Sequence, residues 1–189
     1  MKILNKKIGI DFDDVIVDFS SGFINFINNR LGLYIKKEHI VEYEITKILN
    51  IPKIEIIKLY DDFYKSQNFK QLNLIQNSIK GIYKLAQNND IYIITARNSK
   101  FYEETIASIR DIFNSNIKSI HFTNNNGYRK LKSDICNSLN IDIFIDDSLE
   151  NILDVYKNTT SKVYVFDQPW NRYKLPNKVK RIYSLEELI

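Results

Sequence analysis

The sequence has 189 residues, of which 44% are hydrophobic and 26% are charged, as is ordinary for a soluble globular protein. This length supports one sizeable hydrophobic core, and the presence of only 5 Gly and 3 Pro residues argues against long disordered linkers. The formal net charge is +4, but the Lys and Arg residues are scattered along the chain. We therefore interpret them as solvated surface and expect no polymeric nucleic acid as a partner.

The single cysteine, Cys136, excludes an internal disulfide and is expected to be a packing residue within a helix. No segment is long and apolar enough to span a membrane, so we expect no membrane partner. The N-terminal residues MKILNKK lack the apolar region of a signal peptide, which favours a cytoplasmic protein.

The first 75 residues contain one predicted strand followed by a long helical stretch. Residues 7–11 have the apolar pattern of a buried strand, and residues 19–29 place apolar side chains at helical spacing. Residues 36–50 are a weaker helical candidate, and Pro52 lies early in the first turn of a further helix that continues to residue 66. The region from 19 to 75 is therefore predicted to be a mostly helical insertion.

From residue 78 onward, helices alternate with strands. Helices are predicted over residues 78–88, 99–113, 131–139 and 149–156, with a last helical turn at 184–188. Strands are predicted over residues 91–94, 119–122, 141–145 and 162–166, with loops at 123–128 and 167–176. This alternation predicts an α/β fold with a central parallel sheet and helices on both of its faces.

Four carboxylates interrupt the apolar run KIGIDFDDVIVDF around the first strand: Asp11, Asp13, Asp14 and Asp18. A buried carboxylate without a partner is very costly. We therefore expect a metal ion or a basic side chain to lie beside this cluster.

Polar residues also end two other predicted strands, at Thr95-Ala96-Arg97 and at Asp146-Asp147, and Lys130 and Lys132 precede the helix that leads into the latter strand. Ligands of parallel sheets bind outside the carboxyl ends of the strands, where these groups are expected to meet. Each has a simpler explanation when taken alone: the aspartates as turn residues or helix caps, Thr95 as a plain strand end, and the lysines as solvated side chains. Only their joint order favours chemistry.

This ordered set, Asp-x-Asp, then Thr, then Lys, then Asp-Asp, resembles the haloacid dehalogenase-like phosphohydrolase superfamily over almost the whole chain. The resemblance implies a Rossmann-like three-layer core over residues 1–18 and 76–189, with an inserted helical cap over residues 19–75. It implies a phosphomonoesterase that works through an aspartyl-phosphate and acts on a small-molecule phosphate ester.

The same resemblance implies a role for each matching residue. Asp11 is the nucleophile, and Asp13 is the general acid that protonates the leaving oxygen and then activates water. Mg²⁺ is held by the Asp11 side chain, the Asp13 backbone carbonyl and Asp146. Thr95 and the Ala96 N–H bind the phosphate, and Lys132, whose spacing fits better than that of Lys130, neutralises its charge.

Within the superfamily, the segments IGIDFDDVIVDF, IDIFIDDSLENI and FDQPWNR resemble the 5′(3′)-deoxyribonucleotidases and their bacterial relatives. This resemblance implies a nucleotide substrate, with Phe19 against the nucleobase; alternatively, Phe19 packs beside Phe23 under the cap. The functional alternatives are a phosphatase for another small phosphate, such as a sugar phosphate, and a non-catalytic binding module.

Three further positions have open alternatives. Position 14 is Asp, where many superfamily members have Gly, and its carboxylate either alters the turn or reaches a water near the site. Arg97 either binds substrate or forms a surface pair with an acidic neighbour. Trp170 and Arg172 either form part of the substrate rim, or Trp170 covers the edge of the sheet.

Overall fold

The computed structural model describes residues 3–41, 49, 51–113, 116–125 and 128–189. Within these residues, one seven-stranded sheet has the order β4-β3-β2-β1-β5-β6-β7, so β1 lies at its centre. All neighbouring strands are parallel except β3 and β4. The strands are β1 (Lys7–Ile10), β2 (Asp90–Asn98), β3 (Ser119–Asn125), β4 (Tyr128–Arg129), β5 (Ile143–Asp146), β6 (Lys162–Phe166) and β7 (Lys180–Ile182). The predicted α/β fold with a central parallel sheet is confirmed.

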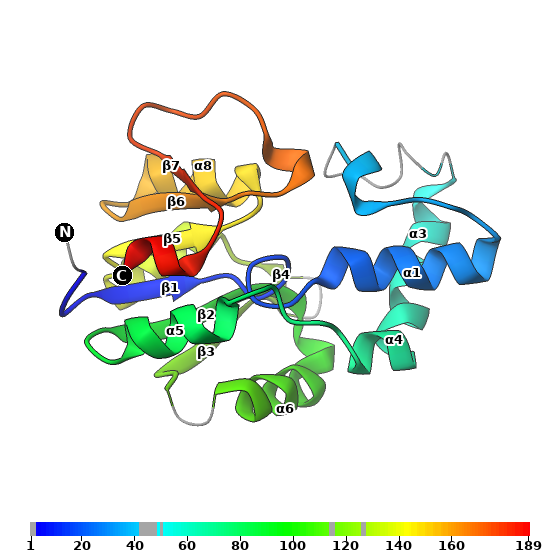
Figure 1. The fold of residues 1–189 in the computed structure, drawn as a ribbon, viewed down its shortest axis with the longest axis horizontal. Coiled ribbons are helices and arrows are strands. Elements are labelled where there is room, and N and C mark those ends of the chain that lie inside the picture. The colour runs from blue at the N-terminus through cyan, green and yellow to red at the C-terminus, as the bar shows by residue number, and fades with distance from the viewer. Residues whose placement is uncertain (1–2, 42–48, 50, 114–115, 126–127) are drawn as a thin grey trace.

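Helices cover both faces of this sheet and give it three layers (Figure 1). One face packs against α5 (Ser78–Ala86), α6 (Tyr102–Phe113) and the short η4 (Leu185–Leu188) through a shared apolar cluster. The other face packs against α7 (Lys132–Leu139) and α8 (Leu149–Asn158). Because β1 is buried on both faces, its residues are nearly all apolar, as expected for a central parallel strand.

The segment between β1 and α5 forms a separate group of helices beyond the carboxyl ends of the strands (Figure 1). It contains α1 (Phe19–Leu31), the short η1 (Lys37–His39), α3 (Lys53–Tyr64) and α4 (Gln67–Lys70). Asp18 caps α1 by accepting a hydrogen bond from the Ser21 backbone N–H, and Gly32, with φ of 64°, ends the helix in a left-handed conformation. The inserted helices share an apolar cluster of their own, distinct from the two clusters beside the sheet.

The chain passes between the sheet and the inserted helices twice, and the two passages lie side by side. The backbone N–H of Asp18 donates to the carbonyl of Asn73 at 2.8 Å, and the N–H of Ile75 donates to the carbonyl of Ile16 at 2.9 Å. These bonds hold the start and the end of the insertion together next to the end of β1.

Two strands of the sheet are absent from the prediction. The sequence from 123 to 128 was expected to be a loop, but β3 continues to Asn125 and pairs with the two-residue strand β4. The strand β7 contains only three residues, of which only Ile182 is buried. Edge strands this short and polar have no alternating apolar pattern by which a sequence could reveal them. Most of the weak helical candidate at 36–50 lies outside the described residues, and its described part contains η1.

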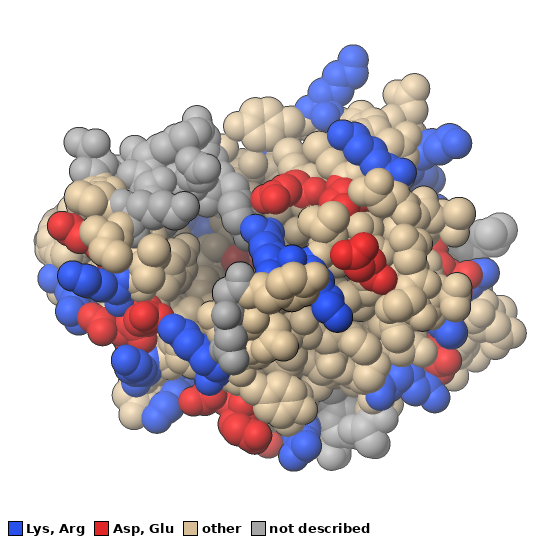
Figure 2. All heavy atoms as spheres, turned by 180° about the vertical axis from the view of Figure 1, so that it is seen from behind, with Lys and Arg blue, Asp and Glu red and all other residues tan. Residues whose placement is uncertain are grey.

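On the face of the molecule seen in Figure 2, Lys and Arg side chains are interspersed with Asp and Glu. The net positive charge therefore does not gather into a single stripe on that face. Among the described residues, no helix has the length and apolarity required to cross a bilayer.

Candidate active site

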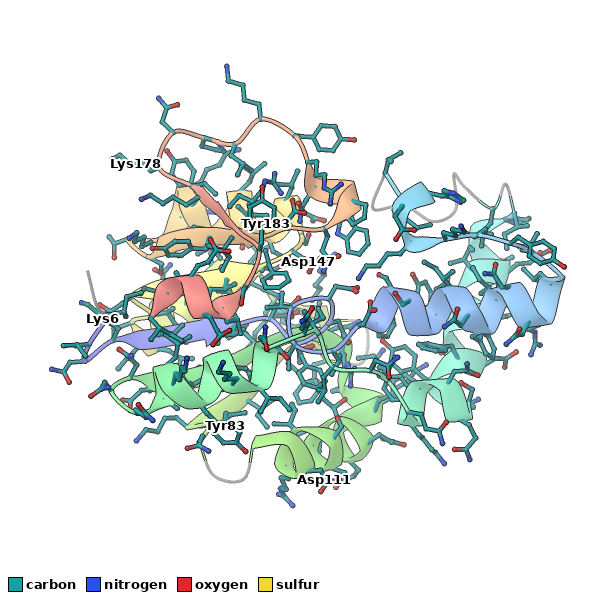
Figure 3. The ribbon with its side chains drawn as sticks, viewed as in Figure 1. Lys6, Tyr83, Asp111, Asp147, Lys178 and Tyr183 are labelled. Atoms are coloured by element: carbon teal, nitrogen blue, oxygen red, sulfur yellow. The ribbon has the colours of Figure 1, made fainter. Side chains whose placement is uncertain are left out.

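The carboxyl ends of β1 and β5 bring Asp11 and Asp146 together. Asp146 is the last residue of β5, and the Asp11 backbone N–H continues the ladder by donating to the Ile145 carbonyl at 2.9 Å. Asp147 follows directly and lies between the sheet and the inserted helices (Figure 3). One carboxylate oxygen from each of these three buried aspartates lies within 4.8 Å of the others.

Lys132 supplies the positive charge inside this cluster. It begins α7, and its Nζ atom lies 2.8 Å from Asp11 Oδ1 and 2.7 Å from Asp146 Oδ2. Although burial opposes the charged form, the two carboxylates raise the pKa of Lys132, so the side chain remains an ammonium. Lys130 is exposed, so the structure places Lys132 and not Lys130 at the strand ends.

The carboxylate of Asp11 is incompletely satisfied. Its Oδ1 atom accepts no hydrogen bond of acceptable geometry from any described residue, despite the nearby ammonium of Lys132. Burial raises the pKa of Asp11 to about 7; Lys132 opposes this effect and Asp146 adds to it. The contact of Oδ1 with Lys132 is therefore an ion pair at 2.8 Å in a buried position.

Asp146 is held differently. Its Oδ1 accepts from the Ser148 backbone N–H at 2.8 Å, its Oδ2 accepts from Lys132 Nζ, and the Asn151 amide reaches both oxygens at 3.3 Å. These donors fix the orientation of the carboxylate at the end of β5.

Asp147 accepts a hydrogen bond from the indole N–H of Trp170 at 2.8 Å. Burial, reinforced by the nearby Asp146, raises the pKa of Asp147 well above its usual range, and Trp170 only partly offsets this. Three buried carboxylates therefore face a single ammonium, which is an unbalanced arrangement without a further cation.

The donor set fits a hard divalent cation. Asp11, Asp146 and Asp147 offer only oxygen atoms, which Mg²⁺ prefers, and one oxygen of each lies within 4.8 Å of the others. The side chain of Asp13 is not part of this group, because it is paired elsewhere.

Asp13 forms a two-point ion pair with Arg97. The guanidinium Nε donates to Asp13 Oδ2 at 2.8 Å, and Nη2 donates to Oδ1 at 2.7 Å. Arg97 is buried, so the acidic partner considered for it exists but the pair is not a surface pair.

Thr95 and Ala96 occupy the end of β2 but face different surroundings. Thr95 is fully buried, and its hydroxyl oxygen accepts from the Arg97 backbone N–H at 3.2 Å, which leaves the hydroxyl proton free to be donated. Ala96 is exposed and lines the cavity described next.

A cavity of about 430 Å³ opens between the strand ends and the inserted helices, a size typical of small-molecule sites. Asp11 and Asp13 line it on one side, whereas Thr95, Lys132 and Asp146 are buried outside its lining. Aromatic residues also line the cavity and form its aromatic wall: Phe19, Phe23, Tyr60, Tyr64, Phe101 and Trp170.

Phe19 packs beside Phe23, as one alternative for it predicts, and it also lines the cavity, so contact with a nucleobase stays a prediction. Its ring lines the cavity, and it also packs against Phe23, with ring centroids 6.4 Å apart, and against Phe63 at 5.3 Å. The other inserted aromatics stack similarly, with Phe23 and Tyr60 at 4.3 Å. This wall offers flat apolar surfaces to a ligand.

Residues 5–189 match the family model described as 5′ nucleotidase, deoxy (pyrimidine), cytosolic type C protein. The chain belongs to this nucleotidase family.

Relatives with curated names agree with this assignment. A nucleotidase of Clostridium acetobutylicum is 29% identical over 188 residues, which cover 96% of this chain and 91% of the relative. A 5′(3′)-deoxyribonucleotidase of Bacillus subtilis is 24% identical over 188 residues, which cover 98% of this chain and 97% of the relative. The predicted superfamily and nucleotidase resemblance are confirmed, and the chain is a phosphoric monoester hydrolase.

Solved structures show the same fold. A haloacid dehalogenase-like hydrolase from Streptococcus pneumoniae has a TM-score of 0.70 at 15% identity, covering 97% of this chain and 96% of that one. A magnesium-bound hydrolase of this kind from Bacillus subtilis has a TM-score of 0.69 at 16% identity, covering 98% of this chain and 97% of that one.

Trp170 lines the cavity, as one of the alternatives for it predicts, whereas Arg172 pairs with Asp167 and is not among the lining residues. The unusual sequence DQPWNR was a usable signal for this position. The contact between Trp170 and Asp147 was not predicted, because it spans 23 residues of chain. Asp147 also belongs to the carboxylate group, although the resemblance assigned the metal only to Asp11, Asp13 and Asp146.

A second unpredicted group surrounds Asp14. Its carboxylate accepts from the Ser20 backbone N–H at 3.1 Å and from the Ser20 hydroxyl at 2.6 Å, and Lys37 lies 3.2 Å away. Burial raises the pKa of Asp14 to about 6, against the opposing effects of Lys37 and Ser20. Lys37 also pairs with Asp18 at 2.7 Å, so the inserted helices are tied to the loop after β1.

Proposed function

We propose that this nucleotidase hydrolyses (deoxy)nucleoside 5′-monophosphates through an aspartyl-phosphate on Asp11, with Mg²⁺ as cofactor. The observation that carries the proposal is the position of Asp11: a buried carboxylate with an unsatisfied oxygen, beside Lys132, at the wall of a cavity lined by aromatic rings. A phosphate monoester resists attack because it is anionic, so its hydrolysis requires a positioned nucleophile and nearby positive charge.

In the proposed reaction, a carboxylate oxygen of Asp11 attacks phosphorus and the bond to the nucleoside 5′-oxygen breaks. Asp13 donates a proton to that oxygen, and the nucleoside leaves. Asp13 then takes a proton from water, whose oxygen attacks the phosphorus of the aspartyl-phosphate. This releases inorganic phosphate and restores Asp11.

The surrounding residues have supporting roles in the proposal. Lys132 neutralises charge on the transferring phosphoryl group, and the Thr95 hydroxyl and the Ala96 N–H bind its oxygens. The Asp11 side chain, the Asp13 backbone carbonyl and Asp146 would hold Mg²⁺, which when bound neutralises phosphate charge and lets a carboxylate approach it.

We also propose that residues 19–75 act as a cap over a core of residues 1–18 and 76–189. The support is that the insertion has its own apolar cluster and supplies most of the aromatic wall. Phe19 would lie against the nucleobase, and closure of such a cap would exclude water from the reaction.

A substrate panel tests the proposed function. The wild-type protein is assayed for phosphate release from deoxynucleoside 5′-monophosphates, ribonucleoside 5′-monophosphates and sugar phosphates, with MgCl₂ and with EDTA. We expect the highest kcat/KM on a nucleotide and loss of turnover in EDTA. Asp11→Asn should abolish turnover on every substrate; full activity of this variant would refute the mechanism, and preference for a sugar phosphate would refute the substrate assignment.

A further inference from the structure

The guanidinium of Arg97 lies over two aromatic rings. Its Cζ atom lies 4.5 Å from the ring centroid of Phe12, which follows Asp11, and 4.8 Å from that of Phe69, which belongs to α4 of the insertion. Stacking of this kind fixes the plane of a guanidinium. The plane is therefore set jointly by the loop after β1 and by an inserted helix.

The edge of the guanidinium is fixed as well. Nε and Nη2 hold the two oxygens of Asp13 at 2.8 and 2.7 Å, and Nη1 donates to the hydroxyl of the buried Thr105 at 3.3 Å. Two parallel hydrogen bonds leave a carboxylate little freedom to rotate. The orientation of Asp13 is thus determined by Arg97.

The two members of the pair differ in exposure. The side chain of Arg97 is 2% exposed and that of Asp13 is 22% exposed. Both residues line the cavity, and the Asp13 carboxylate is the more accessible of the two groups to a ligand there.

We infer that Arg97 is a positioning residue: it holds the Asp13 carboxylate in the orientation that serves proton transfer to and from the reacting oxygens. This inference rests on the proposed function, in which Asp13 carries the proton. Two other roles are distinguishable by experiment, namely direct binding of the substrate phosphate by Arg97 and a purely structural contribution to folding.

The leaving group provides the first readout. Protonation matters for a nucleoside 5′-oxygen, which is a poor leaving group, and matters little for 4-nitrophenolate, which leaves without a proton. For Arg97→Lys, which keeps the charge but loses the fork, we expect kcat/KM to fall about 10–100-fold on thymidine 5′-monophosphate. On 4-nitrophenyl phosphate we expect a loss of less than about threefold, because general acid catalysis contributes little there.

A double-mutant cycle provides the second readout. If Arg97 acts through Asp13, then Arg97→Lys has no further effect on kcat/KM for thymidine 5′-monophosphate in an Asp13→Ala background. Arg172→Lys is the matched control, because Arg172 donates to Asp167 through Nε and Nη2 on the exposed surface. This variant should leave kcat/KM unchanged on both substrates. Thr105→Val removes only the hydroxyl that accepts from Nη1. It should lower kcat/KM less than Arg97→Lys does, and again mainly on thymidine 5′-monophosphate. If Arg97→Lys does not fold, Thr105→Val is the variant that tests the inference.

The outcomes separate the inference from the proposed function. If the wild-type protein hydrolyses neither ester, the proposed function fails. If it hydrolyses both, but Arg97→Lys and Thr105→Val each reduce both esters equally, Arg97 is a structural residue and the inference is overturned. A loss that persists in the Asp13→Ala background would assign Arg97 to phosphate binding and would also overturn it.

Discussion

Replacement of Asp11 by Asn should make the metal-free protein more stable, although most substitutions of buried residues destabilise. The reason is the buried charge of Asp11, which lies in one cluster with the carboxylates of Asp146 and Asp147 and whose pKa is raised to about 7, chiefly by burial. An Asn side chain has nearly the same shape, keeps an acceptor for Lys132 and brings N–H donors into a cluster rich in acceptors.

The magnitude follows from the contacts. Removal of this buried charge from beside two other carboxylates contributes about 1–3 kcal/mol, and the weakened attraction to Lys132 costs about 1 kcal/mol, since Lys132 retains Asp146 at 2.7 Å. The net gain is at most about 2 kcal/mol. For a domain of this length, that gain raises Tm by up to roughly 8 °C.

The matched control is Asp146→Asn, an identical change 2.7 Å from the same ammonium. Both oxygens of Asp146 already accept hydrogen bonds, so one new N–H₂ group must face the donors of Lys132, Ser148 or Asn151. The misplaced donor costs about 1–3 kcal/mol and the weakened attraction to Lys132 about 1 kcal/mol, so Tm should fall by roughly 4–16 °C.

Thermal unfolding of both variants in EDTA, followed by circular dichroism, measures these shifts. If Asp11→Asn lowers Tm as Asp146→Asn does, the conclusion that Asp11 is strained by its surroundings is wrong. Repetition in MgCl₂ adds a test of the metal assignment, because an ion that binds the native state raises Tm. The wild-type Tm should then rise by more than that of Asp11→Asn.

Three other outcomes are expected. Gly81→Ala should lower the free energy of unfolding in urea by about 1–3 kcal/mol, because its Cβ would lie 2.7 Å from Leu185 Cβ; an unchanged midpoint would show that η4 moves freely. Cys136 is 1% exposed, and burial raises its pKa to about 12. Its thiol should therefore resist iodoacetamide at pH 8 in the native protein and react in urea. Rapid alkylation of the native protein would contradict its burial. Lys37→Met should lower the free energy of unfolding by about 3–5 kcal/mol, since it leaves the buried carboxylate of Asp14 without its ammonium. An unchanged free energy of unfolding in urea would show that the hydrogen bonds from Ser20 alone stabilise that carboxylate.

The residues of the candidate site were predictable where their chemistry follows the strand ends. Asp11, Thr95 and Asp146 each end or follow a buried apolar run, and parallel strands place such ends on one edge. Lys132 was preferred to Lys130 because its spacing to Asp146 fits the superfamily resemblance better. The structure places Lys132 Nζ 2.7 Å from Asp146 Oδ2. These relations are local, so a single sequence carries them.

What escaped prediction depends on contacts between distant segments. Arg97 and Asp13 lie 84 residues apart, and Trp170 meets Asp147 across 23 residues. No periodicity encodes such pairs. The strand β7 was missed for a related reason: it is defined by its hydrogen bonds to β6 at the sheet edge, and only Ile182 in it is buried.

The departure from glycine at position 14 shows how a long-range contact changes the meaning of a motif. Asp14 has φ of 56°, a left-handed conformation that costs most residues about 1–2 kcal/mol but that Asp tolerates better than most. Its carboxylate binds Ser20 at the start of α1 and Lys37 in η1, while its carbonyl accepts from the Gln168 amide at 2.7 Å. A glycine would satisfy the backbone alone. The aspartate also connects the loop that presents Asp13 to the inserted helices and to the segment after β6, so we interpret it as a structural link and not as an additional ligand.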